Sequence, residues 1–157
     1  SAGFRLTEIV DEPTAAAAVL GITDGAVVDV GGGTTGISIL EHGKVIDTSD
    51  EPTGGTHMTL VLAGFYGCST EEAEEMKRDA AQEANVFPIV RPVVEKMASI
   101  VKRSLEGYPV DTVYVVGGAC CFTQFEEVFE KYLGIPVVKP AAPLLVTPLG
   151  IAMNCTE

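Results

Sequence analysis

Apolar and polar positions follow two different periods along the chain, and the change of period predicts where strands give way to helices. Residues 27–30 form an apolar run interrupted by one carboxylate, and residues 35–40 alternate apolar with polar side chains. The first pattern is typical of a buried strand, and the second of its hairpin partner. A tight turn at 42–43 leads into a third predicted strand over 44–48. The sheet is therefore expected to begin with three antiparallel strands.

Helical spacing dominates the remainder of the chain. The clearest case is an apolar stripe that predicts a long helix over about 90–105, with Pro88 and Pro92 bracketing its start. This stripe consists of Val94, Met97, Val101 and Leu105. The other predicted helices cover residues 13–20, 58–65, 70–78, 125–132 and 148–154, and two further strands cover 112–116 and 137–138. Strands that come first and helices that alternate later indicate an α/β fold with a mixed sheet.

Several helix starts carry capping signals. Asp11 or Glu12 can accept hydrogen bonds from the free N–H groups of the first helix, and Pro13 suits its first position. Residues 69–72 form a Ser-x-x-Glu capping box, and residues 123–126 form a second box with Thr at its start. These signals place helix starts close to 13, 70 and 125.

Two glycine corners interrupt this pattern of strands and helices. The first reads Asp29-Val30-Gly31-Gly32-Gly33-Thr34, and the second reads Val115-Val116-Gly117-Gly118-Ala119. Consecutive glycines cost backbone entropy, so loop closure alone explains them poorly. They allow a polyphosphate to approach main-chain N–H groups, and a carboxylate beside them can hold Mg²⁺. The alternative is an ordinary glycine-rich turn at each corner.

Composition narrows the class of partner. The chain has 157 residues, of which 46% are hydrophobic, and a net charge of −12, which argues against a nucleic-acid partner. No apolar run reaches the length of a membrane-spanning helix, so no membrane partner is expected. The cysteines and the two histidines lack the spacing of a zinc site, and the adjacent Cys120 and Cys121 are expected to pack as reduced thiols.

Five segments together resemble the motifs of the actin-like ATPases, which include DnaK-type chaperones, sugar kinases and FtsA. The first glycine corner is similar to their second phosphate motif, and the second corner to their adenosine motif. The other three segments are Asp11-Glu12-Pro13-Thr14-Ala15-Ala16-Ala17 and Thr147-Pro148-Leu149-Gly150-Ile151-Ala152, which resemble the two connecting helices, and Glu74-Glu75-Met76-Lys77-Arg78, which resembles the helix that contacts the nucleoside. The resemblance implies a ribonuclease H-like lobe of the actin-like ATPase fold.

The resemblance also implies a role for each matching residue, with ATP or ADP and Mg²⁺ as cofactors. Asp29 would hold Mg²⁺ through water or orient the attacking water, and Glu12 would reach the same metal shell, so these two are the expected catalytic residues. The phosphates would be bound by Gly31, Gly32, Gly33, Thr34 and Thr35, and the nucleoside by Glu74, Lys77, Arg78, Gly117, Gly118 and Ala119. Phosphoryl transfer needs mainly positioning and charge neutralisation, so this set is sufficient for one half of a site.

One position departs from the pattern of the DnaK-type chaperones. Those proteins follow the second Gly-Gly pair with a Ser and then an Arg that stacks on the base, whereas this chain has Ala119, Cys120, Cys121 and Phe122. A cation–π contribution of roughly 0.5–2 kcal/mol is lost unless Arg78 or Phe122 replaces it.

The sequence is expected to provide one lobe of a two-lobed protein. The family's first phosphate motif, an early Asp-x-Gly hairpin, does not precede Glu12. Residues 1–157 therefore resemble the C-terminal lobe, with about 55–107 as an inserted helical subdomain and the N-terminal lobe missing. The segments at 28–37, 53–57, 72–78 and 93–98 resemble a chaperone-like protein of ethanolamine utilisation. That likeness implies ethanolamine-utilisation enzymes or microcompartment proteins as partners, a bacterial cytoplasmic location with microcompartment association as a further expectation, and a homo-oligomer as an open alternative.

The leading functional prediction is an ATP-binding chaperone or assembly factor that hydrolyses ATP slowly only in its two-lobed form. One alternative is a non-enzymatic scaffold or filament-forming protein, and another is a small-molecule kinase of the same superfamily. At the residue level, Glu12 can equally serve as a helix cap alone. Residues 74–78 can form a solvated helix face. His57, beside Gly54-Gly55, can be a loop or core histidine or can touch phosphate.

Overall fold

The computed structural model describes residues 11–153 and contains one mixed sheet of five strands. Its order is β3-β2-β1-β4-β5, with antiparallel pairs β1/β2 and β2/β3 and parallel pairs β1/β4 and β4/β5. The strands are β1 Gly25–Val30, β2 Thr35–Glu41, β3 Lys44–Glu51, β4 Val113–Val116 and β5 Val137–Val138. The predicted antiparallel start and the α/β class are confirmed, and His42 and Gly43 both have the positive φ that their tight turn requires.

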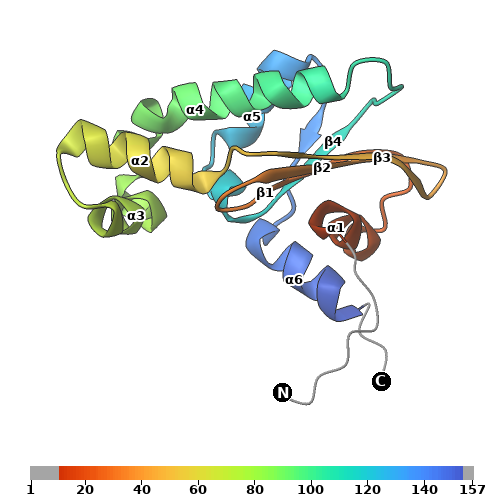
Figure 1. Ribbon diagram of the computed structural model, residues 1–157, viewed down its shortest axis with the longest axis horizontal. Coiled ribbons are helices and arrows are strands. Elements are labelled where there is room, and N and C mark those ends of the chain that lie inside the picture. The colour runs from red at the N-terminus through yellow and green to blue at the C-terminus, as the bar shows by residue number, and fades with distance from the viewer. Residues whose placement is uncertain (1–10, 154–157) are drawn as a thin grey trace.

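Helices cover both faces of the sheet (Figure 1). They are α1 Glu12–Leu20, α2 Gly55–Tyr66, α3 Thr70–Arg78, α4 Glu83–Ser104, α5 Phe125–Leu133 and α6 Pro143–Met153, with short 3₁₀ turns η1 Ala80–Gln82 and η2 Gly118–Cys121. Alternate residues of β1 divide between the two faces: Val28 and Val30 join the large core beneath α2, α4 and α5, whereas Val27 joins a smaller core with α1 and α6. The helices α2 to α4 lie between β3 and β4 in the chain, and their assignment to an inserted subdomain stays a prediction.

The start of the long helix was predicted too late. α4 begins at Glu83, so Pro88 and Pro92 lie inside it and do not bracket its start. Each proline removes one N–H donor from the helix, but both prolines are exposed, and the carbonyl groups that they free can be hydrated. The helix tolerates them because its buried stripe, which includes the predicted core positions Val94 and Met97, lies on the opposite side.

Three other predicted boundaries also need correction. The last helix begins at Pro143 and not near Pro148, which is again an exposed proline inside a helix. β3 continues to Glu51, beyond the predicted end, and α2 begins at Gly55. The second capping box does not form, because α5 is preceded by Gln124 and the N–H and hydroxyl groups of Thr123 donate to the Glu83 carboxylate. The first box, at 69–72, is confirmed.

None of the helices within residues 11–153 is long and apolar enough to cross a membrane. Cys120 is buried as predicted, and Cys121 is exposed. Cys155 lies outside the described residues.

Candidate nucleotide site

The two glycine corners lie at the same edge of the sheet because β1 and β4 are parallel neighbours. Asp29 of β1 is paired with Val116 of β4, so both strands end beside each other before their glycines begin. Gly117 has φ +94°, and a Cβ added there would lie 2.5 Å from both Asp29 Oδ1 and the Val30 carbonyl oxygen. Glycine is therefore required at 117 for both its backbone conformation and its close approach to the first corner.

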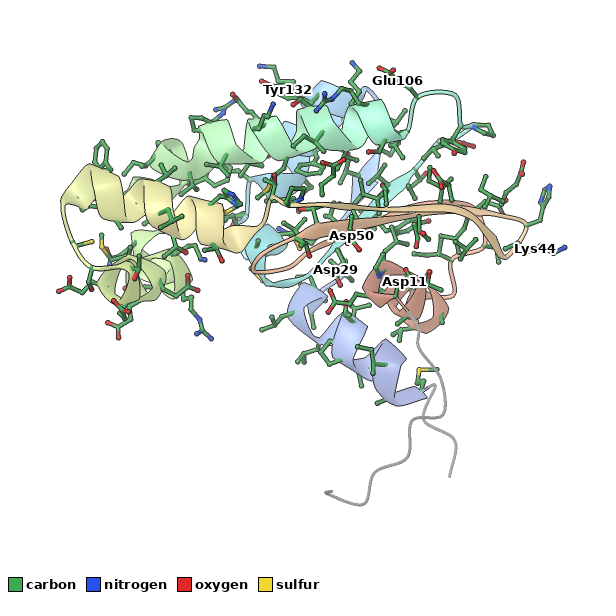
Figure 2. The ribbon with its side chains drawn as sticks, viewed as in Figure 1. Asp11, Asp29, Lys44, Asp50, Glu106 and Tyr132 are labelled. Carbon is green, nitrogen blue, oxygen red and sulfur yellow. The ribbon has the colours of Figure 1, made fainter. Side chains whose placement is uncertain are left out.

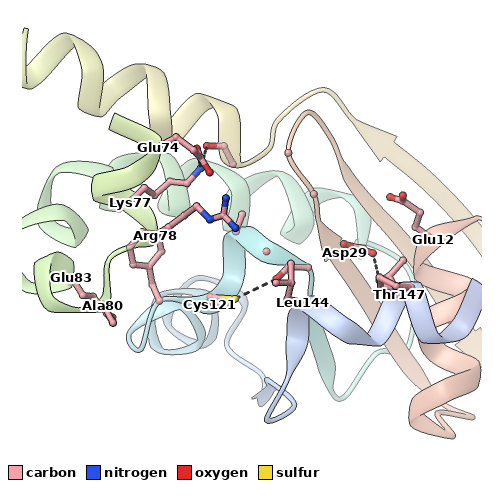
Figure 3. Close-up of a pocket in the computed structure, with 18 of the residues that line it drawn as sticks. Glu12, Asp29, Glu74, Lys77, Arg78, Ala80, Glu83, Cys121, Leu144 and Thr147 are labelled. Carbon is pink, nitrogen blue, oxygen red and sulfur yellow. Dashed lines mark hydrogen bonds and ion pairs between the residues drawn. The ribbon is translucent and has the colours of Figure 1, made fainter. Parts of the chain in front are cut away.

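A cavity of about 830 Å³ opens beside these corners (Figure 3). It reaches from the sheet edge to α3 on one side and to α6 on the other. Its lining includes ten of the residues predicted from the sequence: Glu12, Asp29, Gly31, Gly32, Glu74, Lys77, Arg78, Gly117, Gly118 and Ala119. Three predicted residues, Gly33, Thr34 and Thr35, do not line it.

The carboxylate end of the cavity is centred on Asp29. Its side chain is 4% exposed and accepts a hydrogen bond of 2.5 Å from Thr147 Oγ1 of α6. Burial raises the pKa of Asp29 above its usual value, and the Thr147 hydrogen bond opposes part of that rise. The ionised form of Asp29 is thus disfavoured unless a cation or further donors approach it.

Two more carboxylates surround Asp29. Asp29 is paired with Gly36 of β2, and Gly36 with Asp50 of β3, so Asp29 and Asp50 lie in one row across the sheet with only a glycine between them (Figure 2). Asp11 caps α1 by accepting from the Thr14 N–H, which leaves Glu12 without a capping role. Partial burial and the charges of Asp29 and Asp50 raise the pKa of Glu12.

These carboxylates do not form a metal site by themselves. Across residues 11–153 there is no group of three His, Cys, Asp or Glu side chains that could hold a metal ion. Mg²⁺ usually binds proteins through one or two carboxylates and completes its shell with water and substrate phosphates. Asp29, with Glu12 nearby, fits this mode of Mg²⁺ binding, in which water and substrate phosphates complete the shell.

The first glycine corner turns part of its backbone toward the cavity. The Gly31 N–H donates to the Thr34 carbonyl within the turn, so it has no donor left for a ligand. The N–H groups of Gly32 and Gly33 have no acceptor among the described residues. Thr34 is exposed at the tip of the hairpin, and the buried Thr35 hydroxyl donates to the Thr53 carbonyl at 2.6 Å.

The far end of the cavity is lined by α3. Arg78 extends into this space (Figure 3) and has no hydrogen bond or ion pair with any described residue. Although partial burial by itself raises the pKa of Glu74, hydrogen bonds from Lys77 and Thr59 outweigh it and hold that pKa below its usual value. The Lys77 ammonium lies 2.6 Å from Glu74 Oε2, and the Lys77 side chain is 11% exposed.

The second corner and the residues after it complete the lining. Phe122 packs on Phe87 with ring centroids 5.5 Å apart, so its ring is part of the core although the residue also lines the cavity. Cys121, which belongs to the segment after Gly118 that lacks a stacking arginine, lines the cavity. Arg78 is therefore the only cation in the described lining that is free to contact a base.

Sequence reasoning missed several contributors to this site, among them Thr147, which donates to Asp29. Asp50 and Gly55 fall between the strand predicted over 44–48 and the helix predicted over 58–65, and their roles depend on the register of β3 and on the start of α2. Glu83 and Leu144 line the cavity because α4 and α6 begin earlier than predicted. His57 does not line it; its Nδ1 accepts from the Gly54 N–H at the start of α2, so it is an exposed helix-start histidine.

Comparison with known proteins gives consistent results. The family model described as type IV pilus assembly protein PilM matches residues 17–147. The ethanolamine utilization protein EutJ of Salmonella typhimurium LT2 is 45% identical over 153 residues, which are 97% of this chain and 54% of that protein. The chain thus spans about half the length of the curated EutJ proteins that it matches.

Solved structures agree with the observed fold. The crystal structure of EutJ from Carboxydothermus hydrogenoformans superposes with a TM-score of 0.87 at 56% identity, covering 91% of this chain and 53% of that one. MreB5 of Spiroplasma citri bound to AMPPNP superposes with a TM-score of 0.79 at 16% identity, covering 91% of this chain and 57% of that one. The latter similarity concerns the fold alone. The predicted actin-like ATPase architecture is confirmed.

Proposed function

The chain belongs to the family of the type IV pilus assembly protein PilM and is a homologue of EutJ, and from this premise we propose that it binds MgATP or MgADP as one lobe of a chaperone-like, actin-like protein of ethanolamine utilisation. The observation that carries this proposal is the cavity lined by a buried carboxylate, by Gly32 with its free N–H group and by an unpaired arginine. Its volume of about 830 Å³ lies within the range usual for small-molecule sites.

The polarity of the cavity determines how a nucleotide would lie in it. The phosphates would approach the N–H groups of Gly32 and Gly33, beside Asp29. The nucleoside would extend along Gly117 and Gly118 toward Arg78, whose charge is free to contact the base or ribose. Bound Mg²⁺ would supply charge neutralisation between the phosphates and Asp29. The solved MreB5 relative carries AMPPNP, which supports a nucleotide of this class.

Hydrolysis is proposed only for a two-lobed assembly. The described residues would provide the N–H groups for the phosphates and the carboxylates on one side of the cavity. A second lobe would close the other side, exclude water and complete the positioning of the phosphates. Asp29 and Glu12 would then hold the metal shell or orient a water molecule, and partners would include ethanolamine-utilisation enzymes or microcompartment proteins in the bacterial cytoplasm.

Thermal unfolding with and without nucleotide tests the binding proposal. A ligand present at about 100 times its Kd adds about 2.7 kcal/mol to the free energy of unfolding, which corresponds to a rise of several degrees in Tm. We expect the rise with MgADP and MgATP, and a smaller rise when EDTA removes Mg²⁺. Absence of any shift at millimolar MgADP would refute nucleotide binding by this chain.

A matched pair of arginine variants makes the test specific to the cavity. Arg78→Ala should reduce the shift, because it removes the unpaired cation from the lining. Arg103→Ala removes an exposed arginine from the last turn of α4, outside the cavity lining, and should leave the shift unchanged. Equal shifts in the two variants would place the nucleotide elsewhere.

A non-enzymatic scaffold is the second candidate, and exposed apolar side chains favour it. Leu60 and Phe65 of α2 and Leu149 and Met153 of α6 are each more than half exposed. Surfaces of this kind mark contacts with other proteins. Sedimentation with and without MgATP distinguishes the two candidates, since a degree of assembly that does not depend on nucleotide supports the scaffold.

A further inference from the structure

The Lys77 side chain has no hydrogen-bond donor left for a ligand. Its ammonium donates to Glu74 Oε2 at 2.6 Å, to Thr59 Oγ1 at 2.8 Å and to the Gly55 carbonyl at 3.1 Å. An ammonium carries three N–H donors, so these three acceptors use all of them. Although Lys77 lines the cavity, all three donors of its ammonium are therefore used by acceptors of the protein itself.

The acceptors of Lys77 belong to the part of α2 that supports the first glycine corner. The Gly55 N–H donates to the Gly31 carbonyl at 2.8 Å, and the Thr56 N–H donates to the Gly32 carbonyl at 2.8 Å. Gly55 is therefore bonded to the corner through its N–H and to Lys77 through its carbonyl. A continuous series of hydrogen bonds connects α3 with the backbone that would hold the phosphates.

Close packing leaves this connection little freedom. A Cβ at Gly55 would lie 3.2 Å from Ala119 Cβ, 3.5 Å from the Gly31 carbonyl oxygen and 3.5 Å from Lys77 Nζ. A Cβ at Gly54 would lie 2.5 Å from the Gly32 carbonyl oxygen. Both glycine corners and α3 thus meet at Gly55, where any movement of one would displace the others.

We propose that Lys77 is a positioning residue, which fixes the Gly31–Gly32 backbone for phosphate groups through Gly55, and is not a ligand of the nucleoside. This inference rests on the proposed nucleotide site. It separates the roles of two neighbours on α3: Arg78 contacts the nucleoside, whereas Lys77 acts on the phosphate end from behind the corner.

The proposal predicts a split between ligands with and without phosphates. Lys77→Met should weaken MgADP binding by about tenfold or more, equivalent to about 1.4 kcal/mol, and leave adenosine binding within about twofold. Arg78→Ala should weaken adenosine and MgADP to similar extents. Isothermal titration with the two ligands measures both values, and Lys102→Met, an exposed lysine of α4, is the control. An equal loss of adenosine and MgADP affinity in Lys77→Met would overturn the proposal.

Amide hydrogen exchange tests the same connection without any ligand. The Gly55 and Thr56 amides, which donate to the glycine corner, should exchange faster in Lys77→Met than in wild type or Lys102→Met. Unchanged exchange would also overturn the proposal. Thr59 does not itself line the cavity, and Thr59→Val removes one acceptor of Lys77 together with the hydrogen bonds that Thr59 donates to Glu74 and Gly55. This variant should shift both measurements in the same direction and serves if Lys77→Met does not fold. Failure of wild type to bind MgADP refutes the nucleotide site, whereas the exchange result still decides the role of Lys77.

Discussion

Replacement of Gly117 by alanine is the most direct test of the corner on which the site depends. Two separate costs arise there. The backbone has φ +94° and ψ 168°, a region that only glycine adopts readily, and a side chain there costs about 1–3 kcal/mol. The added Cβ would also lie 2.5 Å from Asp29 Oδ1 and from the Val30 carbonyl oxygen. Overpacking of that kind costs about 1–3 kcal/mol.

The two costs add to about 2–6 kcal/mol, a large part of the usual stability of a domain. For a chain of 157 residues, each kcal/mol lowers Tm by about 2–4 °C. Chemical denaturation monitored by circular dichroism measures the loss of free energy directly. The matched control is Gly33→Ala, since a Cβ at Gly33 meets nothing within 4 Å and its φ is not in the left-handed region.

Two results of the comparison between Gly117→Ala and Gly33→Ala would contradict this geometry. If Gly117→Ala and Gly33→Ala unfold at the same denaturant concentration, the two strand ends do not approach each other as closely as described. A second contrary result would be a destabilised Gly117→Ala variant that binds MgADP as wild type does, because the displaced atoms include the Asp29 carboxylate. Loss of both stability and binding supports the geometry.

Three further predictions follow from particular side chains. Burial raises the pKa of Asp29, so its ionisation costs stability as the pH rises through its folded-state pKa. Asp29→Asn should therefore raise Tm at neutral pH, with a gain that disappears at acidic pH, and should weaken MgADP binding. A lower Tm at neutral pH would contradict this. Gly64 lies within α2 with nothing within 4 Å of an added Cβ, so Gly64→Ala should stabilise the protein by about 0.5–1 kcal/mol in denaturant titrations; a loss would show a requirement for glycine there. Glu83→Ala removes the carboxylate that accepts from Thr123 and should cost about 1 kcal/mol, whereas no cost would indicate that α5 is capped in another way.

The fold could be predicted where local period and packing agree. The apolar run before the first glycine corner and the alternating segment after it both form buried strands, and the α4 stripe of Val94 and Met97 is buried as its spacing indicates. Helix boundaries at proline were wrong because proline is a local signal. Whether a helix continues through Pro88 or Pro148 depends on which face is exposed, and only the packed structure determines that.

The position of Asp50 beside Asp29 could not be predicted from the sequence for a different reason, which is strand register. From the turn at 42–43, regular pairing would place Ser49 opposite Gly36. A register shift between Ile39 and Leu40 instead places Asp50 there. A shift of one residue exchanges the two faces of a strand, so it decides whether this carboxylate lies beside Asp29 or on the other face. The local sequence carries no glycine or proline signal for this irregularity.

The electrostatics of the site give a reason for its dependence on a metal ion. The chain carries a net charge of −12, and Glu12, Asp29 and Asp50 lie close together where the phosphates of a nucleotide would have to bind. Partial burial, together with repulsion from Asp29 and Asp50, raises the pKa of Glu12, and a free nucleotide anion would add to that repulsion. Two backbone N–H groups are too weak to offset several negative charges, whereas a divalent cation shared by Asp29 and the phosphates reverses the sign of the interaction. The nucleotide should therefore enter as its magnesium complex, and binding should depend far more strongly on Mg²⁺ than in sites where lysine or arginine contacts the phosphates.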